Sequence, residues 1–287
     1  MNNAIIQKLS DYQKLTKFRV DIVVALTAVF GYLFSGIDID FKIIFFLFIG
    51  GLLVTATAHI INQVIEKDLD RKMNRTSNRP LVNGKISQTE LIISVIVFSF
   101  TGLFILYLVH PFSAYVSFVS LIMYSLLYTP LKQIHRISIY VGAIPGALPI
   151  LIGYVAATGS IDKTAILLFI FQVLWQLPHF WSIAWLWHDD YTNAGYDLLP
   201  VKGGKTNRNA LLTFLSSLLL FPVIYFLLVN HTINNNVFVT LLLLTSIFVF
   251  TGFLFYKKQN NISAKRLMLS SIIYLPIVQL IIILNQN

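Results

Sequence analysis

A short polar segment stands out in a chain of 287 residues that is 56% hydrophobic and only 11% charged. The segment NQVIEKDLDRKMNRTSNRPL, residues 62–81, crowds both signs of charge directly after the apolar stretch 41–61. Asn62, Glu66 and Asp70 recur every four residues, so a continuing helix would place their oxygens on one face. Mg²⁺ takes one or two carboxylates and lets phosphate oxygens fill other positions. The spacing therefore indicates a site for a magnesium-bound diphosphate.

Three arginines follow with the same spacing, one residue later: Arg71, Arg75 and Arg79. A guanidinium group offers paired donors that match the oxygens of a phosphate, so these arginines are candidates to bind the diphosphate. The alternative is a solvated helix end held by ion pairs at i,i+4 spacing, which is common. From this segment alone, that alternative is favoured.

A second acidic cluster reverses this balance. Six of the twelve Asp and Glu residues form two clusters in polar loops: Glu66, Asp68 and Asp70 in the loop at about 62–90, and Asp189, Asp190 and Asp197 in the loop at about 188–209. The apolar segments that lead into these loops lie four apart and run parallel, so both clusters face one end of the molecule and can surround one cavity. Asp189 and Asp190 are thus candidate catalytic residues, with Asn62, Glu66 and Asp70. The side chains that we expect to bind the metal are Asn62, Glu66, Asp70 and Asp190.

Nine apolar segments must position these residues. A soluble domain could not cover so much apolar surface at a mean hydropathy of +0.75, whereas a bilayer removes the need. Lipid cannot satisfy open strand edges, so the segments are helices. We predict an all-α polytopic membrane protein, one domain over 1–287, with nine transmembrane helices around a central cavity. The predicted spans are 19–37, 41–65, 91–109, 112–130, 138–158, 164–187, 210–229, 236–256 and 267–285.

The basic residues predict how the chain is oriented. With the N-terminus in the cytoplasm and the C-terminus outside, all of the 21 Lys and Arg residues except Lys42 and Lys163 fall in cytoplasmic segments, as the positive-inside rule requires. The net charge of +9 reports this topology, so we expect no nucleic-acid partner. The N-terminal segment shows no small-residue cleavage site, so we expect no cleaved signal peptide. The sequence has no cysteine, which excludes disulfides and thiolate chemistry.

Several motifs resemble the UbiA-type intramembrane prenyltransferases, and within them the protohaem IX farnesyltransferases (haem O synthases). The resemblance covers nearly the whole chain. NQVIEKDLDRKMNRTSNRPLVNGKIS is similar to the first motif of the family, and WQLPHFW followed by DDYTNAGYDLLPVKGG resembles the second. Leu186 and Trp187 stand where the wider superfamily often has a leading Asp, so the metal ligands of the second motif stay open. The other similar segments are LTKFRV at 15–20, YTPLK at 128–132 and GAIPGALPILIGYVAATG at 142–159.

The resemblance implies farnesyl transfer from farnesyl diphosphate to a vinyl group of haem b, with addition of water. The products are haem O, a precursor for terminal oxidases, and diphosphate. Mg²⁺ is the implied cofactor, and YTPLK adds Tyr128 and Lys132 as diphosphate-binding residues. The protein is expected in the bacterial cytoplasmic (inner) membrane, surrounded by lipid, with its active site on the cytoplasmic side. Contact with haem A synthase or with oxidase assembly is left open.

A polar stripe within the sixth predicted span is a candidate haem contact. Gln172, Gln176 and His179 fall at i, i+4 and i+7, and polar groups inside a membrane line cavities by default. His179, assisted by Gln176, would ligate the haem iron or hold a propionate. If the helix persists, Asp190 lies three turns later on the same face, about 16 Å away. The alternative is a stripe that hydrogen-bonds to a neighbouring helix.

Two other functions compete with haem farnesylation. One is a UbiA-type enzyme with a different acceptor, such as a quinone precursor or a chlorophyllide. The other is a secondary transporter, which should carry ionisable residues near the middle of the bilayer. The charges of this chain gather at one end instead, which disfavours transport.

Overall fold

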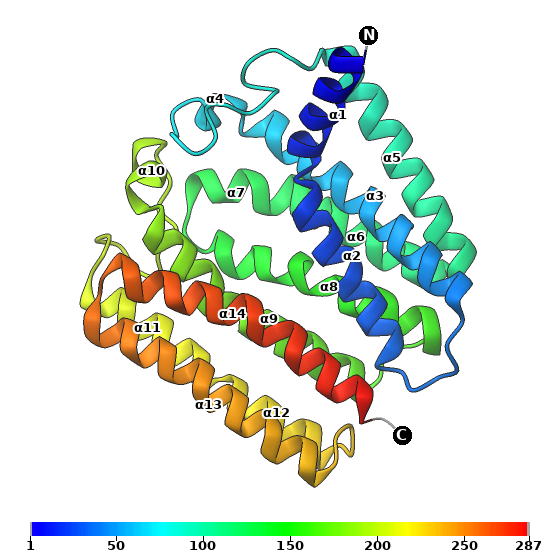
Figure 1. Ribbon diagram of the computed structural model, residues 1–287, viewed down its shortest axis with the longest axis vertical. Coiled ribbons are helices and arrows are strands. Elements are labelled where there is room, and N and C mark those ends of the chain that lie inside the picture. Colours follow the sequence, from blue (N-terminus) through cyan, green and yellow to red (C-terminus); the bar gives the residue numbers. More distant parts are fainter. Residues whose placement is uncertain (1, 286–287) are drawn as a thin grey trace.

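The computed structural model describes residues 2–285, and this part of the chain is helical with no strand (Figure 1). A π-helical stretch, η1, joins two of the α-helices. The elements in chain order are α1 Asn2–Thr16, α2 Phe18–Leu33, α3 Phe41–Ile65, α4 Lys67–Asp70, α5 Gln88–Val109, α6 Pro111–Ile122, η1 Met123–Tyr128, α7 Thr129–Ile134, α8 Ser138–Thr158, α9 Lys163–Leu186, α10 His188–Asn193, α11 Asn207–Leu218, α12 Leu220–Val229, α13 Asn235–Lys258 and α14 Asn261–Leu284.

Eight helical segments between residues 2 and 285 are long and apolar enough to cross a membrane. They coincide with the second to ninth predicted spans, and 41–65 and 138–158 agree to the residue. The first predicted span, 19–37, corresponds to α2, which has only 16 residues. At about 1.5 Å per residue α2 is about 24 Å long, less than a hydrocarbon core of about 30 Å. The ninth crossing is therefore not confirmed.

Polar side chains fix where the long helices begin. Ser87 and Glu90 form a reciprocal capping box at the start of α5, which satisfies backbone N–H groups that have no partner within the helix. Four other helices, α3, α9, α13 and α14, start at an Asp or Asn whose side chain accepts from the first turn. These caps are Asp40, Asp162, Asn234 and Asn260.

The helices pack as a bundle in which α8 links two groups (Figure 1). α8 contacts α2 and α6 on one side and α9 on the other. The approach of α2 to α8 needs glycine, because a Cβ on Gly153 would lie 1.7 Å from the carbonyl oxygen of Ala28. A Cβ on Gly31 would likewise lie 2.1 Å from the carbonyl oxygen of Ile150. Such contacts between small residues are a common way to hold membrane helices together.

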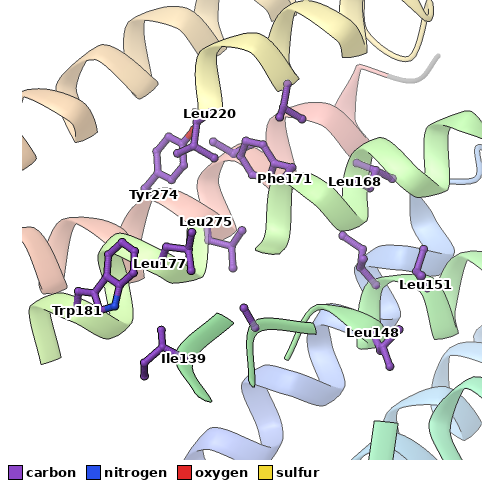
Figure 2. Close-up of a cluster of buried hydrophobic side chains, with 14 of the residues drawn as sticks. Ile139, Leu148, Leu151, Leu168, Phe171, Leu177, Trp181, Leu220, Tyr274 and Leu275 are labelled. Carbon is purple, nitrogen blue, oxygen red and sulfur yellow. The ribbon is translucent and has the colours of Figure 1, made fainter. Parts of the chain in front are cut away.

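The largest cluster of buried apolar side chains surrounds α9 (Figure 2). Phe171 and Leu177 of α9 lie among side chains of α8, α12 and α14, including Leu151, Leu220 and Tyr274. This cluster makes α9 a rigid support for the loop that follows it, which carries the second acidic cluster.

A partly open cavity of about 90 Å³ lies between α2, α3, α6 with η1, and α8. Its walls are mostly apolar or small, and His59 and Tyr124 bring polar groups to them. His59 Nδ1 lies 2.6 Å from Oδ1 of the buried Asp21. Four helical segments thus bound this cavity, whereas the sequence analysis expected nine helices around it.

The fourth span changes its winding beside the cavity. Residues Met123–Tyr128 form the π-helix η1, between α6 and α7. The wider turn is stabilised by the hydroxyl of Thr129, which donates to the carbonyl oxygen of Tyr124 at 2.9 Å. π-helical turns inside α-helices occur frequently at functional sites, and this one leads directly to Lys132.

Candidate active site

Asn62, Glu66 and Asp70 share one buried face, as their spacing predicts. The backbone N–H of Glu66 donates to the carbonyl of Asn62 at 2.9 Å, and that of Asp70 to the carbonyl of Glu66 at 2.8 Å. Helical hydrogen bonding therefore continues past the end of α3 into α4. The three residues are 2%, 2% and 1% exposed, whereas Asp68 between them faces solvent. Charged groups are seldom buried without partners, so their surroundings matter.

The predicted row of arginines is wrong as a helical row, because α4 ends at Asp70. The segment that follows is rich in Asn, Ser, Gly and Pro, which favour turns. Arg71 lies in solvent near Asp68, and Arg75 lies against the second loop. Arg79 folds back and pairs with Asp70 Oδ2. The three arginines therefore have three different environments.

Three cations from separate parts of the chain meet the buried face. Lys132 Nζ lies 3.2 Å from Glu66 Oε1, and Arg79 pairs with Asp70. Lys17, at the junction of α1 and α2, donates to Asn62 Oδ1 at 3.2 Å. Each oxygen-bearing residue of the face thus has its own cation.

These charges shift the pKa values of the groups at the membrane boundary. Burial alone would raise the pKa of Glu66, but the charges of Lys132 and Lys17 hold it below its ordinary value. Burial raises the pKa of Asp70, and Arg79 offsets this only in part. Burial and the nearby Arg79 lower the pKa of Lys17 to about 7. The site has more positive charge than its two carboxylates neutralise, which suits an anionic ligand.

One oxygen of this site has no partner. Asp70 Oδ1 is buried and makes no hydrogen bond within the described part of the chain, an arrangement that costs free energy unless a ligand completes it. Between residues 2 and 285, no three His, Cys, Asp or Glu side chains come together as a metal site. Magnesium does not need such a cluster, because it binds through one or two carboxylates plus substrate phosphates. The unpaired Asp70 oxygen, with Glu66 and Asn62 nearby, fits that requirement.

Asp190 joins the two loops. It is 8% exposed, and Asn74 Nδ2 donates to its Oδ1 at 3.1 Å. The backbone N–H of Arg75 donates to its Oδ2, also at 3.1 Å. Both carboxylate oxygens thus bind the first loop. Asp189 instead points outward, with a side chain 87% exposed, 3.9 Å from Lys205.

A series of aromatic rings and cations connects the second loop to the buried face. The Arg75 guanidinium lies 5.7 Å from the ring centre of Trp187 and 5.6 Å from that of Tyr191. Lys132 Nζ lies 5.7 Å from the ring centre of Tyr191 and 4.7 Å from that of Tyr196. Such cation–π contacts hold flexible cations in place. The aromatic residues thus hold the side chains of Arg75 and Lys132, whereas Asp190 holds the backbone of Arg75.

Tyr128 lies at the same end of the fourth span as Lys132. Its ring packs against Gly142, where an added Cβ would approach ring carbon Cδ2 to 2.5 Å. It also contacts the ring of Tyr124, with 5.2 Å between the ring centres. Tyr128 therefore packs beside Tyr124, which lines the cavity, and lies one helical turn before Lys132.

The polar stripe of α9 follows the alternative arrangement. Gln172 Oε1 accepts from Gln279 of α14 at 3.4 Å, and His179 Nδ1 lies 2.7 Å from the Ser271 hydroxyl, also on α14. Gln176 Nε2 donates to the carbonyl of residue 143 in α8 at 3.0 Å. None of these three side chains lines the cavity between α2, α3, α6, η1 and α8. The helix does not persist to residue 190 either, because α9 ends at Leu186 and α10 follows.

Three residues of the site were missed by the sequence analysis as functional candidates: Lys17, Tyr191 and Tyr196. Lys17 stands in the LTKFRV segment, but it was counted only as a topology-setting charge. It adopts a left-handed backbone conformation, with φ of 59°, which is uncommon outside glycine and turns its side chain toward Asn62. Tyr196 follows the second acidic cluster, and no spacing in the sequence marks it.

Comparison with known sequences identifies one family. Residues 24–273 match the model of the UbiA prenyltransferase family. The protoheme IX farnesyltransferase of Cytophaga hutchinsonii is 36% identical over 277 residues, and the match covers 96% of this chain and 97% of that relative.

Solved structures share the fold. One from a study of digeranylgeranylglyceryl phosphate synthase superposes with a TM-score of 0.79 at 19% identity, covering 98% of this chain and 99% of the other. A UbiA homolog from Archaeoglobus fulgidus bound to GPP and Mg²⁺ gives a TM-score of 0.67 at 15% identity, with 95% and 99% covered. The chain therefore has the helical arrangement of these proteins.

Proposed function

The chain belongs to the UbiA prenyltransferase family, and from this we propose that it transfers a farnesyl group from farnesyl diphosphate to a vinyl group of haem b. Water is added in the reaction, and the products are haem O and diphosphate. The substrate assignment is supported by the protoheme IX farnesyltransferase of Cytophaga hutchinsonii, which matches nearly the full length of both chains. The protein is an integral membrane enzyme, in keeping with its apolar spans.

The observation that carries the proposal is the pair of buried carboxylates, Glu66 and Asp70, surrounded by Lys17, Arg79 and Lys132. Diphosphate leaves easily only when its charge is neutralised, and metal ions and basic side chains provide this. Magnesium would be held by Asp70, Glu66 and Asn62, and when bound it supplies Lewis-acid stabilisation of the leaving diphosphate. The related homolog bound to GPP and Mg²⁺ supports this assignment.

The basic side chains have two roles in this proposal. Lys132 and Arg79 neutralise the carboxylates in the absence of substrate, and they are placed to share their donors with diphosphate oxygens when it binds. Arg75, held over Trp187 and Tyr191, supplies a further cation at the entrance. Arg71 points into solvent and gives only long-range attraction.

The apolar cavity next to the charged face serves the second half of the reaction. When the diphosphate leaves, positive charge develops on the allylic carbons, and water would capture it. Apolar walls exclude water, and the Tyr124 and Tyr128 rings at the boundary can stabilise the cation through their π-electrons. The acidic residues of the second loop act differently: Asp190 positions the first loop, and Asp189 is too exposed to contribute.

We also propose the full topology that the basic residues indicate. α2 is the ninth crossing, with the N-terminus in the cytoplasm and the C-terminus outside. The active site then opens at the cytoplasmic face of the bacterial inner membrane, where farnesyl diphosphate is soluble enough to arrive. Haem b and haem O stay in the bilayer, from which haem A synthase or oxidase assembly can take the product.

The proposal is tested by incubating the purified protein with haem b, farnesyl diphosphate and Mg²⁺, and by reading the product mass. We expect the mass of haem b plus a farnesyl group and a hydroxyl, and no product after chelation of Mg²⁺. Parallel reactions with a quinone precursor and with chlorophyllide test the other acceptors. A prenylated product from one of these, with haem b unchanged, would overturn the assignment.

A further inference from the structure

Tyr196 places a phenol group inside the site with nothing to bind. It follows Gly195, whose φ of 88° turns the chain back after α10, and its backbone N–H donates to the carbonyl of Tyr191 at 2.8 Å. The residue is 3% exposed. Its hydroxyl is buried and has no hydrogen-bond partner between residues 2 and 285.

The other buried tyrosines each have a partner for the hydroxyl. The Tyr274 hydroxyl pairs with Thr245 at 2.7 Å, and the Tyr154 hydroxyl donates to Asp162 at 2.8 Å. Buried tyrosine hydroxyls normally find such partners. Tyr196 is therefore the one buried tyrosine between residues 2 and 285 whose hydroxyl has no partner.

The ring of Tyr196 lies beside a cation of the proposed diphosphate site. Lys132 Nζ is 4.7 Å from the ring centre. Burial raises the pKa of Tyr196, Lys132 opposes this, and Glu66 and Asp70 add to it. The Tyr196 side chain thus lies directly beside the lysine that pairs with Glu66.

One ligand could bind both unpaired groups, Asp70 Oδ1 and the Tyr196 hydroxyl. The Asp70 oxygen can only accept, so it needs a cation, whereas the Tyr196 hydroxyl can donate to an anion. We propose that Tyr196 binds substrate: its hydroxyl donates a hydrogen bond to an oxygen of the diphosphate, while Asp70 binds the accompanying metal. This inference rests on the proposed function, because it takes the ligand to be a magnesium diphosphate.

The change Tyr196→Phe tests the inference because it removes only the hydroxyl and keeps the ring beside Lys132. The control is Tyr274→Phe, in a residue 5% exposed whose hydroxyl is already paired. Binding of inorganic diphosphate with Mg²⁺ to the purified full-length protein is measured by calorimetry, and Tm is measured without ligand. Because a hydrogen bond to a charged group is lost, Tyr196→Phe should bind diphosphate about 10- to 100-fold more weakly.

The two variants should separate binding from stability. Tyr196→Phe should keep or raise the ligand-free Tm, since it deletes an unpaired buried hydroxyl. Tyr274→Phe should lower Tm and bind diphosphate as the wild type does. In turnover, Tyr196→Phe should raise the KM for farnesyl diphosphate and leave the KM for haem b unchanged.

Three outcomes would count against the inference. Equal diphosphate affinity in wild type and Tyr196→Phe would overturn it and leave the proposed function standing. A lower Tm with unchanged affinity would give Tyr196 a purely structural role. A wild-type protein that binds no diphosphate in the presence of Mg²⁺ would overturn both the inference and the proposed function.

Discussion

Glu66 and Asp70 lie one helical turn apart but differ in their partners. Both oxygens of Glu66 lie near Lys132, at 3.2 and 3.5 Å from its Nζ. Asp70 has one oxygen on Arg79 and one without a partner. Their pKa values accordingly shift in opposite directions, down for Glu66 and up for Asp70. Asp70 therefore has a carboxylate oxygen open to metal, whereas Glu66 would bind metal while it also holds Lys132 in place.

We predict that Asp70→Ala and Glu66→Ala each lower kcat/KM by about 100-fold or more, because each removes charge that the metal and its diphosphate require. Product formation as a function of Mg²⁺ concentration checks this, with membrane insertion measured in parallel. Asp70→Ala should also shift the Mg²⁺ dependence to higher concentration.

The control for both variants is Asp189→Ala, since that carboxylate is 87% exposed and should be dispensable. Near-normal activity of Asp70→Ala or Glu66→Ala, at normal expression, would rule out a metal role for that residue.

Lys132→Met should weaken the use of farnesyl diphosphate far more than the binding of haem b. The change removes a cation that is placed to bind diphosphate, and it leaves Glu66 buried without a partner, so we expect a loss of about 100-fold in kcat/KM for farnesyl diphosphate. Steady-state kinetics with each substrate varied in turn provide the measurement.

Arg75→Met should also lower kcat/KM for farnesyl diphosphate, but by less than Lys132→Met, because Arg75 lies at the exposed edge of the site. Lys72→Met, also exposed, is the matched control. A fall in haem affinity without a fall in farnesyl diphosphate affinity would reverse the assignment of Lys132.

Sequence spacing could identify the residues of the site that share one helix, and not those that come from elsewhere. Asn62, Glu66 and Asp70 are recognisable because a four-residue repeat has a direct geometric meaning in a helix. Lys17 reaches the site through a left-handed turn, and Tyr196 through the path of a loop. Neither conformation leaves a periodic signal, so both needed the folded structure.

At the scale of elements, the important contact is the one between the two loops. Asp190 accepts from Asn74 and from the backbone of Arg75, and Arg136 pairs with Asp197 at 2.9 Å. These contacts join three segments of the chain: the first loop, the connection between α7 and α8, and the second loop. They make the first loop part of a rigid assembly, although it contains no helix after α4.

Asp190→Ala should release this loop, because it removes both of these contacts to the first loop. Each hydrogen bond to a charged group contributes about 1.5–3 kcal/mol. The loss of one such bond should therefore raise the rate of amide hydrogen exchange over residues 71–79 by about 10-fold or more. Exchange mass spectrometry on the purified protein measures it. Unchanged exchange in that segment would show that the loop is held by other contacts.

Gly153→Ala should destabilise the protein by about 1–3 kcal/mol, because the new Cβ overpacks the contact between α2 and α8. The matched control is Gly51→Ala, where an added Cβ meets ordinary contacts at 3.6 Å and alanine favours the helix. Thermal unfolding in detergent compares the two. Equal Tm values would mean that α2 and α8 can move apart at no cost.

The positions of the long helices were predicted correctly from the sequence, but only some of their ends were. α3 and α8 match because polar or glycine residues bound a run of apolar residues on both sides. The arginine row failed because turn-forming residues after Asp70 outweighed a regular charge spacing. α2 was predicted too long, since an apolar run reports burial in lipid and not where the helix itself stops.

At the scale of the whole molecule, the proposed topology makes α2 cross the membrane despite its 16 residues. The chain has no cysteine, so single cysteines can report their location without background. Lys14→Cys and Asp38→Cys, both exposed and on opposite sides of α2, should be labelled by an impermeant thiol reagent from opposite sides of the membrane. Labelling of both from the same side would leave eight crossings and overturn the proposed N-terminal orientation.

The separation of Glu66 from Lys132 also has a consequence in time. The two residues are 66 positions apart, and at roughly 5–20 residues per second a ribosome needs roughly 3–13 s to cover that distance. During this interval Glu66 has been synthesised and its lysine has not. We expect the Glu66 carboxylate to stay hydrated at the membrane surface until the fourth span inserts. Only then can Lys132 pair with it and the carboxylate become buried.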